Sequence, residues 1–164
     1  MGPAQSFIAL APAALLAALL LIAAVYDLRH RIIPNWLNLT IALAAPLAWI
    51  ASGIELWPDL ALQVGLALLV FAAFVGLFFL GGIGGGDVKM IGALALWLPT
   101  SLLLPTLLVM AIVGGAIAAV MLVIRWWRRG AGSPELPYGV AIAAAGLWAV
   151  HQQYLNHSPF IALS

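Results

Sequence analysis

Charged residues are scarce in this 164-residue chain. Six Lys or Arg and five Asp or Glu make up 7% of the residues, whereas a typical soluble domain is about 25% charged. Because so few charges cannot form a water-facing surface, the composition excludes a soluble globular protein. The net charge of +1 provides no basic surface for a nucleic acid. The chain also lacks cysteine, which excludes disulfides, thiolate nucleophiles and cysteine-ligated zinc.

Apolar segments, in contrast, are long, and 66% of the residues are hydrophobic. Since about 20 mostly apolar residues cross a bilayer as a helix, the sequence predicts an all-α, polytopic membrane protein with six transmembrane helices. The predicted spans are residues 7–26, 36–54, 60–80, 88–98, 103–124 and 137–154. Pro99 and Pro105 mark the break between the fourth and fifth spans. Because the connections are short, residues 1–164 are expected to form a single membrane-embedded domain.

The positions of the charges predict the orientation of these spans. All six basic residues lie in the loops after the first, third and fifth spans, whereas Glu55 and Asp59 lie on the opposite side. The positive-inside rule therefore places the basic loops in the cytoplasm and both termini outside. No basic residue precedes the first span, so we expect it to be retained as an anchor. Tryptophans near span ends, including Trp97, are expected in the membrane interface.

Two aspartates at the cytoplasmic ends of spans are the candidate catalytic residues. Asp27 ends the first span, and by itself it is most simply an interfacial carboxylate paired with Arg29, Arg31 or His30. Asp87 precedes the fourth span, and by itself it is most simply the N-cap of that helix. An N-cap does not explain the five glycines among residues 81–86. These glycines indicate a tightly bent backbone or the close approach of another group.

As a pair, the two aspartates could hydrolyse a peptide bond. If the first and fourth spans are neighbours, their carboxyl groups can share one proton, because two close carboxylates do not easily both ionise. The ionised carboxylate would take a proton from water, and the protonated carboxyl would donate to the peptide carbonyl. This chemistry uses no metal and no cofactor, and we expect neither.

Three segments at this face resemble the motifs of the type IV prepilin peptidase family of membrane aspartic proteases. The similarity is closest to its short members, which process prepilins of tight-adherence (Flp-type) pili. The matching residues are Asp27, Pro34 and Asn35 in the first segment, Gly84, Gly86, Asp87 and Lys89 in the second, and Tyr138 and Gly139 in the third. The second segment corresponds to the family's Gly-x-Gly-Asp motif.

The resemblance implies an aspartic endopeptidase that removes the leader from Flp-type prepilins during type IV pilus biogenesis. Asp27 and Asp87 would be catalytic, Gly84 and Gly86 would shape the loop, and Lys89 would flank it. The implied partners are membrane lipid and a prepilin with a basic leader and a hydrophobic helix. The implied location is the cytoplasmic face of the bacterial inner membrane.

Long members of this family carry a cysteine-containing cytoplasmic domain between the first two spans and also methylate the new N-terminus. Here that connection is only about Asp27 to Asn35, and it contains no cysteine. We therefore expect no methyltransferase activity.

Other functions remain open on the sequence alone. A related peptidase for preflagellins or other helical membrane substrates would use the same pair. A small ion- or proton-coupled transporter usually carries its charges near the bilayer midplane and has a repeat between its halves, and this chain has neither feature. A non-enzymatic scaffold would tolerate loss of either aspartate.

The last basic loop contains further charges with less specific roles. Glu135 is a candidate contact for the basic leader, although an exposed loop charge is the simpler interpretation. Arg125, Arg128 and Arg129 are expected to fix the topology and to contact anionic lipid.

Overall fold

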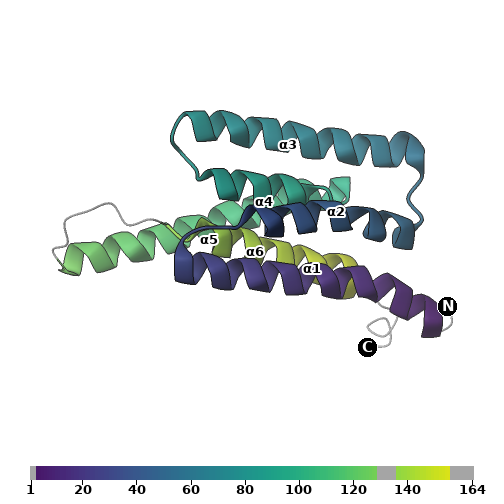
Figure 1. Cartoon of the computed structure of the whole chain (residues 1–164). Helices are drawn as coiled ribbons and strands as arrows, with labels where there is room; N and C mark the ends of the chain where they lie inside the picture. The colour runs from purple at the N-terminus through teal and green to yellow at the C-terminus, as the bar shows by residue number, and fades with distance from the viewer. Residues whose placement is uncertain (1–2, 129–135, 156–164) are drawn as a thin grey trace.

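The computed structural model describes residues 3–128 and 136–155, which form helices and no strands. The all-α prediction is therefore confirmed. The helices are α1 (Pro3–His30), α2 (Asn35–Ser52), α3 (Ala61–Phe79), α4 (Gly85–Ala95), α5 (Thr100–Arg128) and α6 (Tyr138–Val150), with short helical turns at Leu56–Leu60 and His151–Leu155. Successive helices run in alternating directions, so α1 begins and α6 ends at the same end of the bundle (Figure 1).

Helices of very different length make up this bundle. Within the described residues, three segments are long and apolar enough to cross a membrane: Leu10–His30, Leu56–Phe79 and Thr100–Ile124. The helix α4 has only 11 residues, and at 1.5 Å per residue it is about 17 Å long, roughly half the thickness of the hydrocarbon core. The count of six spans therefore remains a prediction.

Two helix boundaries differ from the predicted ones. The helix α1 continues to His30, so Asp27 lies inside it. It ends where Arg31 adopts a left-handed conformation (φ 55°) and donates its N–H to the Asp27 carbonyl oxygen at 2.9 Å, a common way to close a helix. The helix α5 already begins at Thr100 and contains Pro105. Of the two prolines, only Pro99 therefore lies in the break between α4 and α5.

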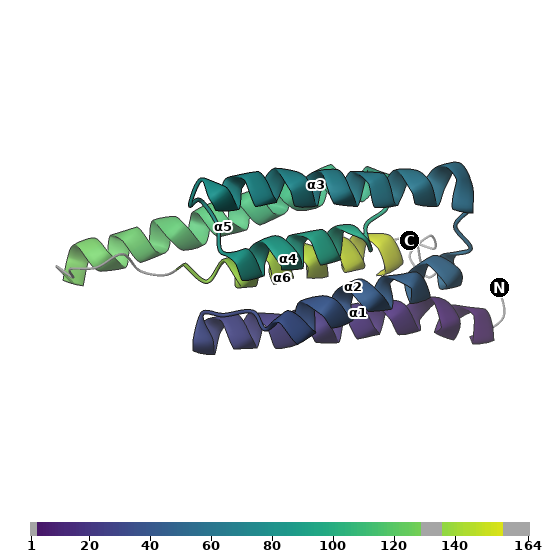
Figure 2. The same cartoon turned by 45° about the horizontal axis from the view of Figure 1, so that its top comes forward.

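The helix α4 lies at the centre of the packing. It contacts α2, α3 and α6, while α1 packs against α2 and α6, and α5 packs mainly against α6 (Figure 2). Leu20 of α1 and Leu94 of α4 both lie against Gly146 of α6, where an added Cβ would be 2.7 Å from Leu20 Cδ1 and 3.2 Å from Leu94 Cδ1. The helices α1 and α4 are linked mainly through α2 and α6, each of which packs against both of them, rather than as a directly packed pair.

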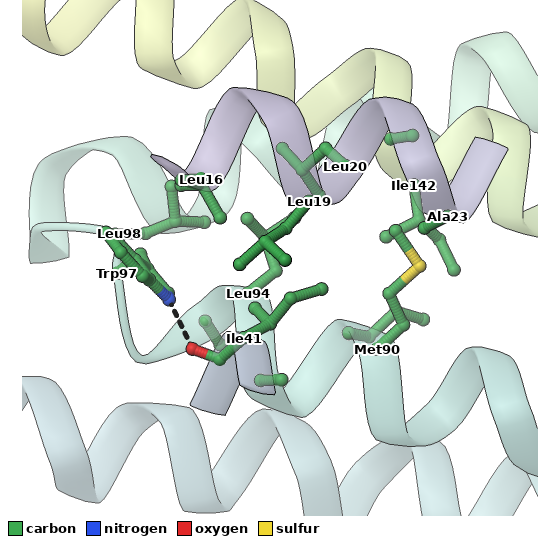
Figure 3. Close-up of a cluster of buried hydrophobic side chains, with 14 of the residues drawn as sticks. Leu16, Leu19, Leu20, Ala23, Ile41, Met90, Leu94, Trp97, Leu98 and Ile142 are labelled. Carbon is green, nitrogen blue, oxygen red and sulfur yellow. Dashed lines mark hydrogen bonds between the residues drawn. The ribbon is translucent and has the colours of Figure 1, made fainter. Parts of the chain in front are cut away.

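One continuous apolar core joins these helices (Figure 3). Its buried members include Leu16, Leu19, Leu20 and Ala23 of α1, Ile41 of α2, Met90 and Leu94 of α4, and Ile142 of α6. This core fixes the end of α1 relative to the start of α4, and the candidate active site lies there.

The C-terminal end of α4 is buried inside the bundle, where free carbonyl groups need donors. The Leu96 carbonyl oxygen accepts from Trp49 Nε1 at 2.9 Å and from Gln63 Nε2 at 2.8 Å. Trp97 is only 3% exposed, and its Nε1 donates to the Ile41 carbonyl oxygen at 2.8 Å (Figure 3). The expected interfacial position of Trp97 is therefore wrong, because this indole anchors the end of α4 to α2.

Candidate active site

Asp27 and Asp87 line the same cavity, which has a volume of about 500 Å³ and lies where α1 ends and α4 begins. Asp27 is 4% exposed, and Asp87 is partly exposed. Most of the other motif residues identified in the sequence line the cavity as well, namely Pro34, Asn35, Gly84, Gly86 and Lys89. The structure thus brings together two segments that are 60 residues apart in the chain.

The N-terminus of α6 holds the Asp27 carboxylate. Asp27 Oδ2 accepts the Val140 N–H at 3.1 Å, and the Gly139 N–H also donates to this carboxylate. A helix N-terminus favours a negative charge. A Cβ at Gly139 would lie 2.9 Å from both Cγ and Oδ2 of Asp27. Glycine at position 139 therefore allows the carboxylate to reach these two N–H groups.

Asp87 occupies the third position of α4 rather than its N-cap. The N-cap is Gly84, which contributes no side-chain hydrogen bond, and the Asp87 carboxylate reaches back to accept the Gly84 N–H. This bond is the reciprocal half of a capping box. The prediction that Asp87 is the N-cap is therefore wrong by three residues. A Cβ at Gly84 would lie 2.9 Å from Asp87 Oδ2, so this bond requires the small residue.

The glycines before Asp87 also end α3. Gly81 has φ +75°, and its N–H donates to the Phe78 carbonyl oxygen at 2.9 Å, while the Gly82 N–H donates to the Leu77 carbonyl oxygen at 3.0 Å. These two bonds form a Schellman motif, which needs a left-handed residue at the position of Gly81. The tight bend and the close approach that the glycines indicated are thus both present.

Two asparagines on α2 connect it to the first turns of α4. Lys89 Nζ donates to Asn35 Oδ1 at 2.8 Å, and Asn38 Nδ2 donates to the Gly86 carbonyl oxygen at 3.0 Å. Asn35 and Lys89 are among the site residues predicted from the sequence, whereas Asn38, which is 4% exposed, is not. A signal was present, since a polar side chain within an apolar span is rarely without a function.

Tyr138 does not line the cavity. Its ring packs on α5, where a Cβ at Gly114 would lie 2.7 Å from Tyr138 Cε2. Glu135 and Arg129 lie outside the described residues, as do the side chains of Arg125 and Arg128. Their predicted roles therefore remain predictions.

The two carboxyl groups influence each other electrostatically. Asp87 lies in the first turn of α4, before the apolar part of that helix. Burial raises its pKa from 3.8 to about 6, and the nearby negative charge of Asp27 contributes to the increase. Two interacting acids titrate as a unit. A pair in which Asp87 has a pKa of about 6 can hold a single proton at mildly acidic pH, as acid–base catalysis requires.

The chain is similar to known proteins of one family. A model described as the type IV leader peptidase family matches residues 14–120. Two curated relatives from Burkholderia pseudomallei, strains 1026b and K96243, are named prepilin leader peptidase/N-methyltransferase. Each is 34% identical over 158 residues, which cover 88% of this chain and 46% of the relative. The chain thus spans less than half the length of these relatives. No solved structure matches it.

Proposed function

Because the chain belongs to the type IV leader peptidase family, we propose that it removes the leader peptide from Flp-type prepilins, with Asp27 and Asp87 as the catalytic pair. The observation that carries this proposal is the cavity that contains both carboxyl groups. The family assignment supplies the reaction class, and the cavity supplies a place for the scissile peptide and a water.

The proposed reaction needs one proton on the pair. Asp87 is the better candidate to hold that proton. Asp27 Oδ2 accepts the Val140 N–H at the N-terminus of α6, which favours the ionised form of Asp27, and burial raises the pKa of Asp87 to about 6. Ionised Asp27 would take a proton from a water, whose oxygen attacks the scissile carbonyl carbon. Protonated Asp87 would donate to the carbonyl oxygen, giving a neutral tetrahedral intermediate. The C–N bond then breaks as the leaving nitrogen takes the proton now on Asp27, while Asp87 takes back a proton from a hydroxyl group of the intermediate and the C=O bond re-forms.

The charges support the proposed orientation in the bacterial inner membrane. Arg29 and Arg31 follow Asp27, and Lys89 lies beside Asp87, whereas Glu55 and Asp59 lie between α2 and α3 at the other end of the bundle (Figure 1). By the positive-inside rule, the end with the cavity faces the cytoplasm. This end is where the junction between a basic leader and an apolar helix would lie.

We further propose cleavage without methylation. The relatives' names include N-methyltransferase, but the connection between α1 and α2 in this chain is only residues 31–34, which leaves no room there for an added domain. Mass measurement of the mature product, with and without S-adenosylmethionine, tests this proposal. A methyl group added by the purified protein would contradict it.

The test of the function is cleavage of a defined substrate by the purified protein in lipid vesicles. We expect a single new N-terminus at the junction between the basic leader and the apolar helix, found by mass spectrometry. A Flp-type prepilin, a preflagellin-type substrate and an unrelated single-span protein should be compared side by side. Equal cleavage of the first two would contradict Flp specificity, and no cleavage of any would contradict the peptidase.

Cleavage should depend on pH because the pair must retain its proton. Asp87 has a raised pKa of about 6, so the proton is lost as the pH rises through that region. We expect kcat/KM at about pH 9 to be at least about tenfold below its value at pH 6. Circular dichroism at both pH values controls for unfolding. A flat profile from a folded enzyme would argue against the shared proton.

A further inference from the structure

An apolar groove of about 450 Å³ opens beside the cavity that contains the two aspartates. Its floor is α4, and its walls are α2 and α3, which each pack on α4. Figure 2 shows α4 between α3 and α2. The polar residues of the groove are Asn35, Asn38 and Lys89, and they all lie at the end nearest Asp87.

The groove and the cavity adjoin each other. Asn35 and Lys89 line both of them, and these two side chains are hydrogen-bonded at 2.8 Å. From this junction the groove follows α4 past Gly92 and Ala93 to Leu96. At 1.5 Å per residue, the path from Lys89 to Leu96 is about 10 Å long. It therefore matches about seven residues of a second helix.

The edges of the groove are accessible from the side of the bundle. Leu39 of α2 is 57% exposed and Leu68 of α3 is 61% exposed, and both line the groove. Small residues lie deeper, among them Ala42, Ala67 and Ala93. In a membrane, small residues allow another helix to pack closely.

We propose that this groove binds the start of the substrate's apolar helix, directly after the bond that Asp27 and Asp87 would cleave. The inference rests on the proposed function, because it takes the scissile peptide to lie in the shared cavity. A chain that leaves this cavity toward the membrane needs an apolar path. The groove provides that path, and its only polar residues lie where a chain would enter it. A substrate helix bound in the groove would hold the scissile bond at a fixed position along α4.

Narrowing the groove should weaken substrate binding. Ala42→Phe places an aromatic ring on the α2 wall, and we expect kcat/KM to fall at least tenfold, mainly through KM. The matched control is Ala51→Phe on the same helix. Ala51, like Ala42, is partly buried, and it lines a separate apolar hollow of about 450 Å³ between α1 and α2. This control should cleave within about twofold of wild type.

Disulfide crosslinking tests occupancy without any need for cleavage. Because the chain has no cysteine, Leu68→Cys in an Asp87→Asn background gives a single thiol at the groove. A prepilin with one cysteine among the first seven residues after its cleavage site should crosslink there. The control is Leu47→Cys, whose native side chain is 52% exposed and lines the other hollow. We expect its yield to be at least fivefold lower.

The outcomes separate the groove from the function. If wild type cleaves, Ala42→Phe cleaves normally and the Leu68→Cys yield equals that of the control, then the groove holds lipid only and this proposal is overturned while the peptidase stands. If wild type cleaves no substrate but the crosslink forms selectively at Leu68→Cys, the proposed function fails and the binding site stands.

Discussion

Asp27→Asn and Asp87→Asn should each reduce prepilin cleavage at least about a thousandfold, because each removes one of the two groups that move protons in the proposed mechanism. Asparagine keeps the size of aspartate, and at position 27 its oxygen can still accept the Val140 N–H that Asp27 Oδ2 accepts at 3.1 Å. We therefore expect both variants to insert and fold. Rates are measured by single-turnover cleavage in vesicles, and folding by gel filtration and thermal unfolding in detergent.

Asp59→Asn is the matched control for this pair. Asp59 is exposed and lies just before α3, at the opposite end of the bundle from the cavity, so its substitution should change the rate less than about twofold. If Asp27→Asn or Asp87→Asn cleaved at near the wild-type rate, the catalytic pair would be wrong. A transporter or a scaffold would then become the better explanation of the two aspartates.

Gly139→Ala should reduce cleavage about a hundredfold although both aspartate side chains are still present. The added methyl group would lie 2.9 Å from Asp27 Cγ and 2.7 Å from Ile33 Cδ1, so the carboxylate must shift away from the N-terminus of α6. Displacement of a catalytic group by about 1 Å can reduce a rate by this factor. The measurement is kcat/KM with a prepilin substrate, and we expect most of the loss in kcat.

Two further variants identify the cause of that loss. Gly115→Ala adds the same methyl group to α5 where nothing lies within 4 Å, and it should leave cleavage within about twofold of wild type. Adding Ile33→Ala to Gly139→Ala removes the contact with Ile33 but not the contact with Asp27. Full rescue by this second change would show that the carboxylate is not the group displaced.

The sequence predicted much of the candidate site because charges are so scarce. Asp27 and Asp87 are two of five acidic residues, and the span ends at which they are predicted share a side of the predicted topology. The contacts of Asn38 and Val140 could not be predicted in this way. The first depends on α2 lying against α4, and the second on α6 lying against α1. A hydropathy pattern gives the spans but not their order around the bundle.

The same limit explains the errors at Trp97 and Asp87. An apolar run predicts where a helix lies, but it does not show that α4 ends inside the protein, where Trp97 anchors it to α2. The N-cap prediction for Asp87 assumed that the helix starts after the glycines. In the structure Gly85 and Gly86 are already helical, because Asp87 supplies the missing acceptor to Gly84 from within the first turn.

The bond between Asp27 and Val140 also bears on the order of biosynthesis. The two residues are 113 positions apart, so α1 must enter the membrane long before its carboxylate meets the N–H groups of α6. A nascent chain that already contains both aspartates still lacks these donors, and a carboxylate in an apolar bundle is unfavourable without them. The Asp27 carboxylate therefore reaches its final environment only after α6 has packed against α1.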